Sequence, residues 1–346
     1  MFYDEPVFFE RNRVRRVYTG GKLFSDFFDD ESVDDYYPEE WIASSVRAIN
    51  KGSIDPYEGI SKITGTDIYL NEALKEYKTE MLGEKNEIGI LTKLIDSAVR
   101  LPVQAHPDKE FSRKYFNSSH GKEESWIILA TRPGAKIYYG FRDSVSLSDF
   151  EKAIDESEFN PGNMESLLNS IEVIPGDVVY IPAKFVHAIG AGCLLLEVQE
   201  PTDFTIQPER WCGEYKLSDE EMYLGLSREQ ALGCFEIGKK YPAPLNPVLI
   251  SEGDGCVYQS AIDDFITKSF SVRIITLDGG KFLLDKSAAV YVVTEGQGEI
   301  TGENYKKNIR RGDYFFIPDA CVNKYTMTGN VKITECYSDA EKEEEE

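Results

Sequence analysis

The stretch that decides the fold is residues 171–200, IEVIPGDVVYIPAKFVHAIGAGCLLLEVQE. Its short runs of apolar residues, many of them β-branched, are separated by the turn signals Pro-Gly-Asp and Gly-Ala-Gly. β-Branched residues favour strands, and Gly and Pro favour the turns between them. This stretch therefore predicts consecutive antiparallel strands.

A second stretch, residues 309–336 (IRRGDYFFIPDACVNKYTMTGNVKITEC), repeats the first. Both contain Gly-Asp, four strand-like residues, a Pro and then further strand-like residues around a Gly. When Gly176-Asp177 is aligned with Gly312-Asp313, His187 falls opposite Asn323. An internal repeat of short strands is typical of two jelly-roll units. We therefore expect a mainly β protein with two jelly-roll barrels, of which the second has lost at least one histidine.

Helical segments are expected to interrupt these units. Ser218 and Glu221 form a capping box at the start of 217–238, which predicts a helix there. Within 56–99, YLNEALKEYKTEML and ILTKLIDSAV also look helical. We expect such helices to pack or cover rather than to carry chemistry. The predicted layout begins with an N-terminal unit at 1–212, which contains a helical insertion at about 56–100. A helical linker at 213–245, a second unit at 246–338 and an acidic tail at 339–346 follow.

Composition restricts the partners. The chain of 346 residues has a formal net charge of −23, which argues against nucleic acid and anionic membranes as partners. Six scattered cysteines without a CxxC pair predict reduced thiols in a cytoplasmic protein. No apolar run approaches the roughly 20 residues that span a bilayer. The sequence leaves the oligomeric state open.

Four polar side chains form a candidate metal site. In LPVQAHPDKE (101–110), Gln104 and His106 would share one face of a strand. In HGKEESWIILA (120–130), either Glu123 or Glu124 should point inward, where a carboxylate needs a partner or a metal. His187 lies between apolar residues of a predicted strand. Each of these features alone is more often structural, but together they predict a mixed nitrogen and oxygen site.

This ligand set has a chemical consequence. Two neutral imidazoles, one amide oxygen and one carboxylate around a divalent cation leave a net charge of about +1, which preserves Lewis acidity. Zn²⁺ suits such a set, with Mn²⁺, Co²⁺ or Ni²⁺ as substitutes. These properties are typical of a catalytic metal site rather than a structural one.

The ordered motifs resemble the type I mannose-6-phosphate isomerases, zinc enzymes of the cupin superfamily, and most closely their short bacterial branch. The similar segments are EPVFFERNRVRRVYTGGKL, EEWIASS, VQAHPD, GKEESW and PGDVVYIPAKFVHAIGAG. The resemblance implies two cupin barrels, one zinc ion per chain and the ligands Gln104, His106, Glu124 and His187. It thus selects Glu124 over Glu123.

The resemblance also implies the reaction, which interconverts mannose 6-phosphate and fructose 6-phosphate through a cis-enediol. Lys122 matches the family's lysine beside the glutamate ligand, and Asp203 matches an aspartate in PTDFTIQPERW (201–211). Gln207 stands where relatives carry an arginine over the reacting sugar, and Arg210 lies three residues further on. We therefore expect Lys122, Asp203 and Arg210 to be catalytic, with Gln207 contacting the substrate.

The phosphate needs local cations and hydroxyls, for which Ser44, Ser45 and Lys136 are the candidates. Three alternatives stay open. The chain could be an isomerase of a different phosphorylated aldose, or a sugar-phosphate-binding cupin without turnover, which Gln207 favours. An iron-dependent cupin dioxygenase is the third, and its usual His-x-His pair is lacking here.

Overall fold

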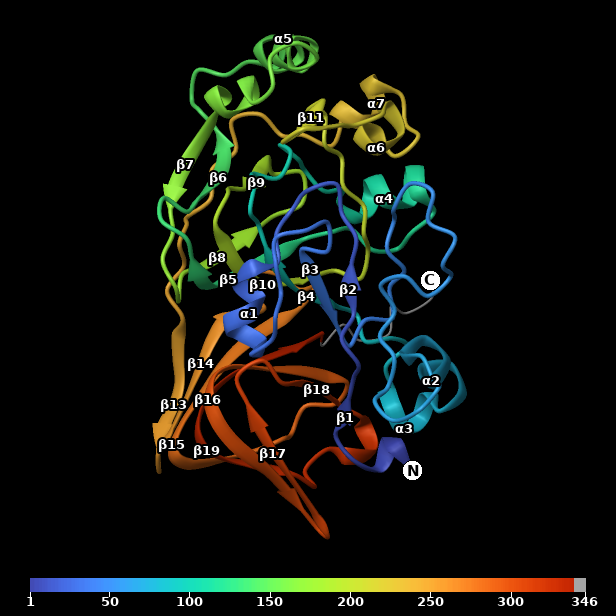
Figure 1. Ribbon diagram of the computed structural model, residues 1–346, viewed down its shortest axis with the longest axis vertical. Helices are drawn as coiled ribbons and strands as arrows, with labels where there is room; N and C mark the ends of the chain where they lie inside the picture. The colour runs from blue at the N-terminus through green and yellow to red at the C-terminus, as the bar shows by residue number, and fades with distance from the viewer. Residues whose placement is uncertain (339–346) are drawn as a thin grey trace.

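The structure is a computed structural model that describes residues 1–338. Its strands form two large and two small sheets, all with antiparallel pairing. In Figure 1 the sheets built by the middle of the chain lie above the sheet built mostly by its C-terminal part. The fold is mainly β, as the sequence predicts. The predicted acidic tail lies outside the described residues.

The N-terminal unit contains a six-stranded sheet with the strand order β2-β3-β4-β10-β5-β8 and a three-stranded sheet with the order β7-β6-β9. The six strands are β2 Arg13–Val14, β3 Glu39–Ile42, β4 Leu91–Asp96, β5 Glu124–Thr131, β8 Val178–Ile181 and β10 Cys193–Gln199. The three strands are β6 Lys136–Phe141, β7 Leu168–Glu172 and β9 His187–Ile189. Consecutive strands β8 and β9 therefore belong to different sheets, which places the metal candidates from both sheets opposite one another.

The C-terminal sheet has the order β1-β18-β16-β19-β15-β14-β13, with β17 paired to β16. Its strands are β1 Val7–Phe8, β13 Val248–Gly253, β14 Cys256–Ile262, β15 Ser271–Leu283, β16 Ala289–Gly302, β17 Tyr305–Arg310, β18 Tyr314–Ile317 and β19 Thr326–Tyr337. The start of the chain thus joins the C-terminal sheet through β1. The repeat predicted from sequence corresponds to β8 and β10 in one unit and to β18 and β19 in the other.

Residues 91–96 of ILTKLIDSAV form strand β4, and the helical prediction for this segment was wrong. All six residues of β4 are buried, and β4 pairs with β3 on one side and with β10 on the other. Thr92, Lys93 and Asp96 are buried together with the apolar residues of this strand. The apolar residues stand at the i, i+3 and i+4 spacing of a helix face, so periodicity alone did not indicate a strand.

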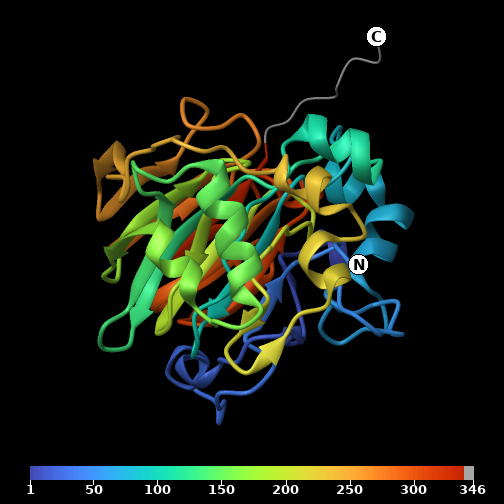
Figure 2. The ribbon, with the colours of Figure 1, turned by 90° about the horizontal axis from the view of Figure 1, so that it is seen from above.

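The helices lie around the sheets (Figures 1 and 2). They are α1 Lys22–Phe28, α2 Leu70–Glu76, α3 Lys78–Leu82, α4 Lys109–Phe116, α5 Leu147–Ser157, α6 Asp219–Tyr223 and α7 Arg228–Leu232. The capping box at Ser218 and Glu221 is present and starts α6. The segment 217–238 holds two short helices, α6 and α7, and not one long helix. A two-stranded ribbon, β11 Trp211–Cys212 and β12 Tyr215–Lys216, precedes them. Every helix in residues 1–338 is too short or too polar to cross a bilayer.

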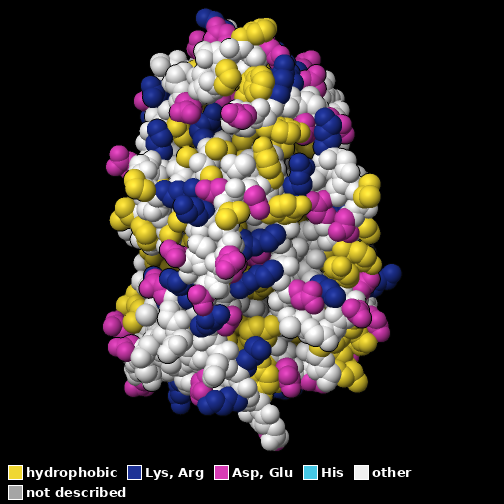
Figure 3. All heavy atoms as spheres, viewed as in Figure 1, with side chains coloured by type: hydrophobic (Ala, Val, Ile, Leu, Met, Phe, Trp, Pro, Cys, Tyr) yellow, Lys and Arg dark blue, Asp and Glu magenta, His cyan; other side chains and the backbone are white. Residues whose placement is uncertain are grey.

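One apolar cluster joins the two units. It contains Leu94 and Leu196 from the N-terminal sheet together with Val290 and Phe316 from the C-terminal sheet. Burial of these side chains holds the sheets together, because each fully buried Leu or Phe contributes roughly 1.5–3 kcal/mol. On the face shown in Figure 3, acidic and basic side chains are interspersed. The negative charge of the chain is therefore not gathered into a single patch on this face.

Candidate active site

The Gln-x-His segment lies against β9 rather than in a regular strand. The backbone N–H of Gln104 donates to the carbonyl of His187 at 3.0 Å, and the N–H of His187 donates to the carbonyl of Gln104 at 2.9 Å. Pro102 and Pro107 flank this isolated bridge, and proline has no N–H to extend a ladder. The strand predicted for this segment is reduced to a bridge, which still brings Gln104 beside His187.

Three ligand-type side chains meet inside the N-terminal unit. Ligand atoms of His106, Glu124 and His187 all lie within 4.8 Å of one another, and all three residues are buried. The Nε2 atoms of His106 and His187 lie 3.0 and 3.7 Å from carboxylate oxygens of Glu124. The amide nitrogen of Gln104 lies 3.4 Å from His187 Nε2. Since amide nitrogen and oxygen are assigned rather than observed, a rotation by 180° places the amide oxygen there.

Both imidazoles are oriented through Nδ1. His106 Nδ1 lies 2.9 Å from the carbonyl of Phe204, and His187 Nδ1 lies 2.8 Å from the carbonyl of Phe185. A carbonyl accepts a proton and therefore fixes the Nδ1–H tautomer, so each Nε2 presents a lone pair. Burial lowers the pKa of His106, and burial with the neighbouring His106 lowers the pKa of His187 to about 3. Both rings are therefore neutral at physiological pH.

The residues present fit a divalent metal. In a tetrahedral zinc site with bonds of about 2.0 Å, neighbouring ligand atoms lie about 3.3 Å apart, which is close to the 3.0, 3.4 and 3.7 Å separations of this cluster. Among the described residues, neither carboxylate oxygen of Glu124 accepts a hydrogen bond of good geometry. Neutral Nε2 atoms facing a carboxylate form an electron-rich cluster that a cation would stabilise.

The adjacent glutamates face different surroundings. Glu124, 1% exposed, starts β5 and points into the cluster, whereas Glu123 accepts a hydrogen bond from Thr267 of the C-terminal unit. The Nζ of Lys122 lies 2.9 Å from Glu124 Oε1 and donates to Thr205 Oγ1 at 3.3 Å. Burial acts to raise the pKa of Glu124, but the positive charge of the Lys122 ammonium beside it holds that pKa well below its usual value.

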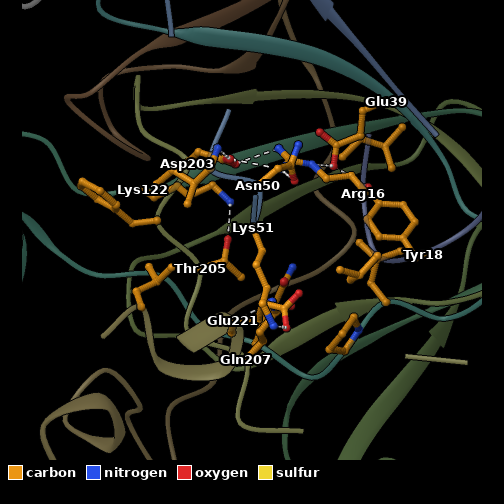
Figure 4. A pocket seen from close by; sticks show the side chains of 18 of the residues that line it. Arg16, Tyr18, Glu39, Asn50, Lys51, Lys122, Asp203, Thr205, Gln207 and Glu221 are labelled. Atoms are coloured by element: carbon orange, nitrogen blue, oxygen red, sulfur yellow. Dashed lines mark hydrogen bonds and ion pairs between the residues drawn. The ribbon is translucent and has the colours of Figure 1, made fainter. Parts of the chain in front are cut away.

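A cavity of about 510 Å³ opens onto this cluster. Gln104, Lys122 and Glu124 line the cavity, and so do Lys51 and Glu221. Figure 4 shows Lys122 and Thr205 pointing toward one another. A cavity of this size is within the range of small-molecule sites.

Five charged side chains in the wall form a buried network. Arg16, Glu39, Lys93, Glu197 and Asp203 all line the cavity. Burial acts to raise the pKa of Glu39, but Arg16 and Lys93 lower it to about 2. Burial and the nearby charge of Glu124 raise the pKa of Glu197 to about 7. Lys93 lies 3.3 Å from Glu197 and 3.9 Å from Glu39. The network therefore holds charges that offset one another inside the protein.

The sequence analysis missed four members of this network. A single lysine in ILTKLIDSAV and a single glutamate in CLLLEVQ (193–199) stand inside strand segments, and buried charges of that kind are usually paired. Those two residues, Lys93 and Glu197, were thus detectable. Arg16 and Glu39 pair across segments far apart in the sequence, and no local pattern predicts their contact.

Several predicted residues do not line the cavity. In the described part of the chain the lining includes Lys122, Asp203 and Gln207 but not Ser44, Ser45, Lys136 and Arg210. Ser44 is fully buried, and its hydroxyl is bonded to the backbone of Val46. Lys136 lies 5.1 Å above the ring of Tyr138.

Arg210 does not occupy the space expected for it. Its guanidinium lies 3.0 Å from Glu158 and 2.8 Å from Asp219, and it donates to the carbonyl of Leu217 at 2.9 Å. The Gln207 amide lines the cavity but donates to the carbonyl of Glu221 at 3.0 Å. Ion pairs with Glu158 at the end of α5 and with Asp219 at the start of α6 therefore direct Arg210 away from the predicted catalytic position.

The tautomer argument makes a prediction for the metal-free protein. Of the three histidines, we expect His120 to titrate at the highest pH, because its pair with Glu87 raises its pKa above 6.5. His106 should lose its proton at lower pH, and His187 should stay neutral down to about pH 3. A pH series of imidazole NMR spectra measures all three, with His120→Asn assigning the high-pH signal. A midpoint near 6.5 for His187 would contradict the buried neutral ring.

Comparisons with known proteins find relatives over nearly the whole chain. A family model described as "Mannose-6-phosphate isomerase, cupin domain" matches residues 261–338. The mannose-6-phosphate isomerase ManA of Bacillus subtilis (strain 168) is 30% identical over 326 residues, covering 91% of this chain and 93% of ManA. The mannose-6-phosphate isomerase of Streptococcus mutans serotype c (strain ATCC 700610 / UA159) is 26% identical over 341 residues, covering 96% of this chain and 98% of the relative.

Solved structures show the same fold. A crystal structure of the mannose 6-phosphate isomerase from Bacillus subtilis matches with a TM-score of 0.78 at 23% identity, covering 96% of this chain and 99% of that one. A phosphomannose isomerase structure from Salmonella typhimurium matches with a TM-score of 0.73 at 15% identity, covering 97% of this chain and 100% of that one.

Fold and site together define an enzyme of the cupin superfamily with an interior histidine and carboxylate cluster. The chain belongs to the mannose-6-phosphate isomerase family, type I.

Proposed function

We propose that this chain interconverts mannose 6-phosphate and fructose 6-phosphate with a divalent metal, zinc, held by Gln104, His106, Glu124 and His187. The observation that carries the proposal is the buried cluster of two neutral imidazoles and the Glu124 carboxylate, beside a 510 Å³ cavity that Gln104 and Glu124 line. Mn²⁺, Co²⁺ and Ni²⁺ suit the same ligands and are the expected substitutes.

The reaction needs a base and stabilisation of negative charge. A proton leaves C2 of the aldose while O1 gains a proton, which gives the cis-enediol; C1 then gains a proton while O2 loses one, which gives the ketose. Bound zinc would supply Lewis acidity for the charge that develops on the sugar oxygens. Lys122 is our candidate for proton transfer, because its Nζ lines the cavity beside Glu124 and Thr205.

Other polar groups would orient the substrate. The carboxylate of Asp203 lines the cavity and is held by Arg16, so we propose that it accepts a sugar hydroxyl. Among the lysine and arginine side chains that line the described cavity, that of Lys51 is the most exposed, at 52%. We therefore place the phosphate of the substrate near Lys51. Ser44, Ser45 and Lys136 are not used in this proposal, because they do not line the cavity described for residues 1–338.

Turnover by the zinc-loaded protein tests the proposal. A coupled assay should convert mannose 6-phosphate to fructose 6-phosphate faster than it converts glucose 6-phosphate or ribose 5-phosphate. A faster reaction with another aldose phosphate would reassign the substrate. Binding of mannose 6-phosphate without turnover would favour a sugar-phosphate-binding protein, the alternative supported by Gln207, whose amide is bonded to the Glu221 carbonyl.

A further inference from the structure

The cavity contains one arginine, and it comes from the N-terminal segment. Four cations line the described cavity, namely Arg16, Lys51, Lys93 and Lys122. The side chain of Arg16 is only 11% exposed, and its guanidinium has several carboxylate and amide partners. Arg16 lies in RNRVRRVYTGG, outside the segment 201–211 in which an arginine was expected.

The guanidinium of Arg16 connects three segments of the wall. Its Nε donates to Glu39 of β3 at 2.9 Å. Its two terminal nitrogens donate to the two oxygens of Asp203, at 3.1 and 2.9 Å, and one of them also donates to Asn50 Oδ1 at 3.2 Å. Figure 4 shows Arg16 between Glu39 and Asp203. The two parallel hydrogen bonds from this planar fork fix the orientation of Asp203.

Asp203 transmits this constraint to both sides of the cavity. Its Oδ2 also accepts the backbone N–H of Ile49 at 2.8 Å, which fastens the loop that carries Asn50 and Lys51. On the other side, Asp203, Thr205 and Gln207 alternate along one segment and all line the cavity. Thr205 accepts the hydrogen bond from Lys122 at 3.3 Å. The Arg16–Asp203 pair therefore sets the separation between the loop with Lys51 and the segment beside Lys122.

We propose that Arg16 is a positioning residue for the substrate, which holds Asp203 and, through it, the two walls of the cavity. Gln207 and Arg210 do not take this role, because both are bonded to groups around α6. This inference rests on the proposed isomerase function and adds a residue to it. In residues 1–338 the Arg16 guanidinium is bonded to Glu39, Asn50 and Asp203 and makes no hydrogen bond or ion pair with the proposed metal ligands, so its loss should leave metal binding intact.

The test compares Arg16→Met and Arg16→Lys with Arg132→Met in the zinc-loaded full chain. Arg132 is the matched control, because it also binds two carboxylates, those of Asp34 and Asp96. It follows the C-terminal end of β5, whereas Glu124 is the first residue of that strand. A displacement of about 1 Å costs roughly 100-fold in rate. We therefore expect Arg16→Met to lower kcat/KM by about 100-fold, split between a higher KM and a lower kcat.

Three further readouts make the role specific. Zinc content should equal that of the wild type in all variants. Arg16→Lys should restore part of kcat/KM, because lysine keeps the charge but lacks the bidentate fork. Arg16→Met combined with Asp203→Asn should be no worse than Arg16→Met alone, since residues that act through one another are not additive.

The outcomes separate the inference from the proposed function. Kinetic constants of Arg16→Met equal to those of Arg132→Met would overturn the positioning role, and so would loss of zinc from Arg16→Met. Should Arg16→Met fail to fold, Arg16→Lys and Asp203→Asn decide the question, because both must raise KM. If the wild-type protein isomerises the substrate and these variants keep its kinetic constants, the inference is wrong and the proposed function stands. Wild-type protein without turnover defeats the proposed function and the inference with it.

Discussion

Replacing Glu124 by glutamine is expected to abolish stoichiometric zinc binding and to reduce turnover by about 1000-fold, since Lewis-acid stabilisation supplies several kcal/mol of the barrier reduction. The substitution preserves the shape of the side chain but removes its negative charge. Both imidazoles in the cluster are neutral, so Glu124 is the one anionic side chain among the four proposed ligands. Without the Glu124 carboxylate, no ligand would offset the double positive charge of a bound metal. That charge would then lie close to the Lys122 ammonium, whose Nζ is 2.9 Å from the carboxylate in the wild type.

Glu123→Gln is the matched control for this prediction. It makes the same chemical change one residue earlier, at a side chain bonded to Thr267 and absent from the described cavity lining. Zinc per chain, measured by plasma mass spectrometry, should fall below about one tenth of wild type for Glu124→Gln and stay unchanged for Glu123→Gln. Equal zinc content in the two variants would contradict the ligand assignment.

The second large effect is expected for Lys122→Met, which should lower kcat by about 100-fold to 10,000-fold while zinc remains bound, because general acid–base catalysis contributes that much. The side chain of Lys122 is 5% exposed, and its Nζ lies near Thr205 and Glu124. Methionine keeps the length and apolar stem of lysine but carries no transferable proton. The change in KM should be small if Lys122 acts mainly in proton transfer.

Lys109→Met serves as the control, because Lys109 is 43% exposed and lies 3.7 Å from Glu200, outside the described cavity lining. Steady-state kinetics with mannose 6-phosphate and zinc analysis should be run on both variants. A rise in KM with kcat unchanged would show that Lys122 binds substrate instead of moving a proton. Loss of zinc from Lys122→Met would show that it supports the metal ligands.

Much of the fold was predictable, because its signals are local. Turn residues around Gly176 and Gly312 mark the strands of both units, and the capping box at Ser218 marks the start of α6. The segment 91–96 was mistaken for a helix because its apolar residues have helical spacing, whereas the strand also buries its polar residues. The bridge between Gln104 and His187 brings together two predicted ligands that are far apart in sequence.

The rest of the site depends on contacts that no local pattern encodes. Arg210 was placed in the cavity by its position in the chain, but Glu158 and Asp219, which lie on separate elements, bind it elsewhere. Arg16 and Asp203 form their pair across 187 positions of sequence. Residue type indicates that such charges need partners, but only the packing of the sheets determines which partners they find.

The central claim is that a metal bound by this cluster is required for sugar-phosphate isomerisation. The most direct test is the coupled mannose 6-phosphate assay on protein as purified, after chelation, and after zinc is added back to the chelated protein. We predict that activity disappears on chelation and returns with about one zinc ion per chain. Activity that persists in protein shown to be metal-free would contradict the account.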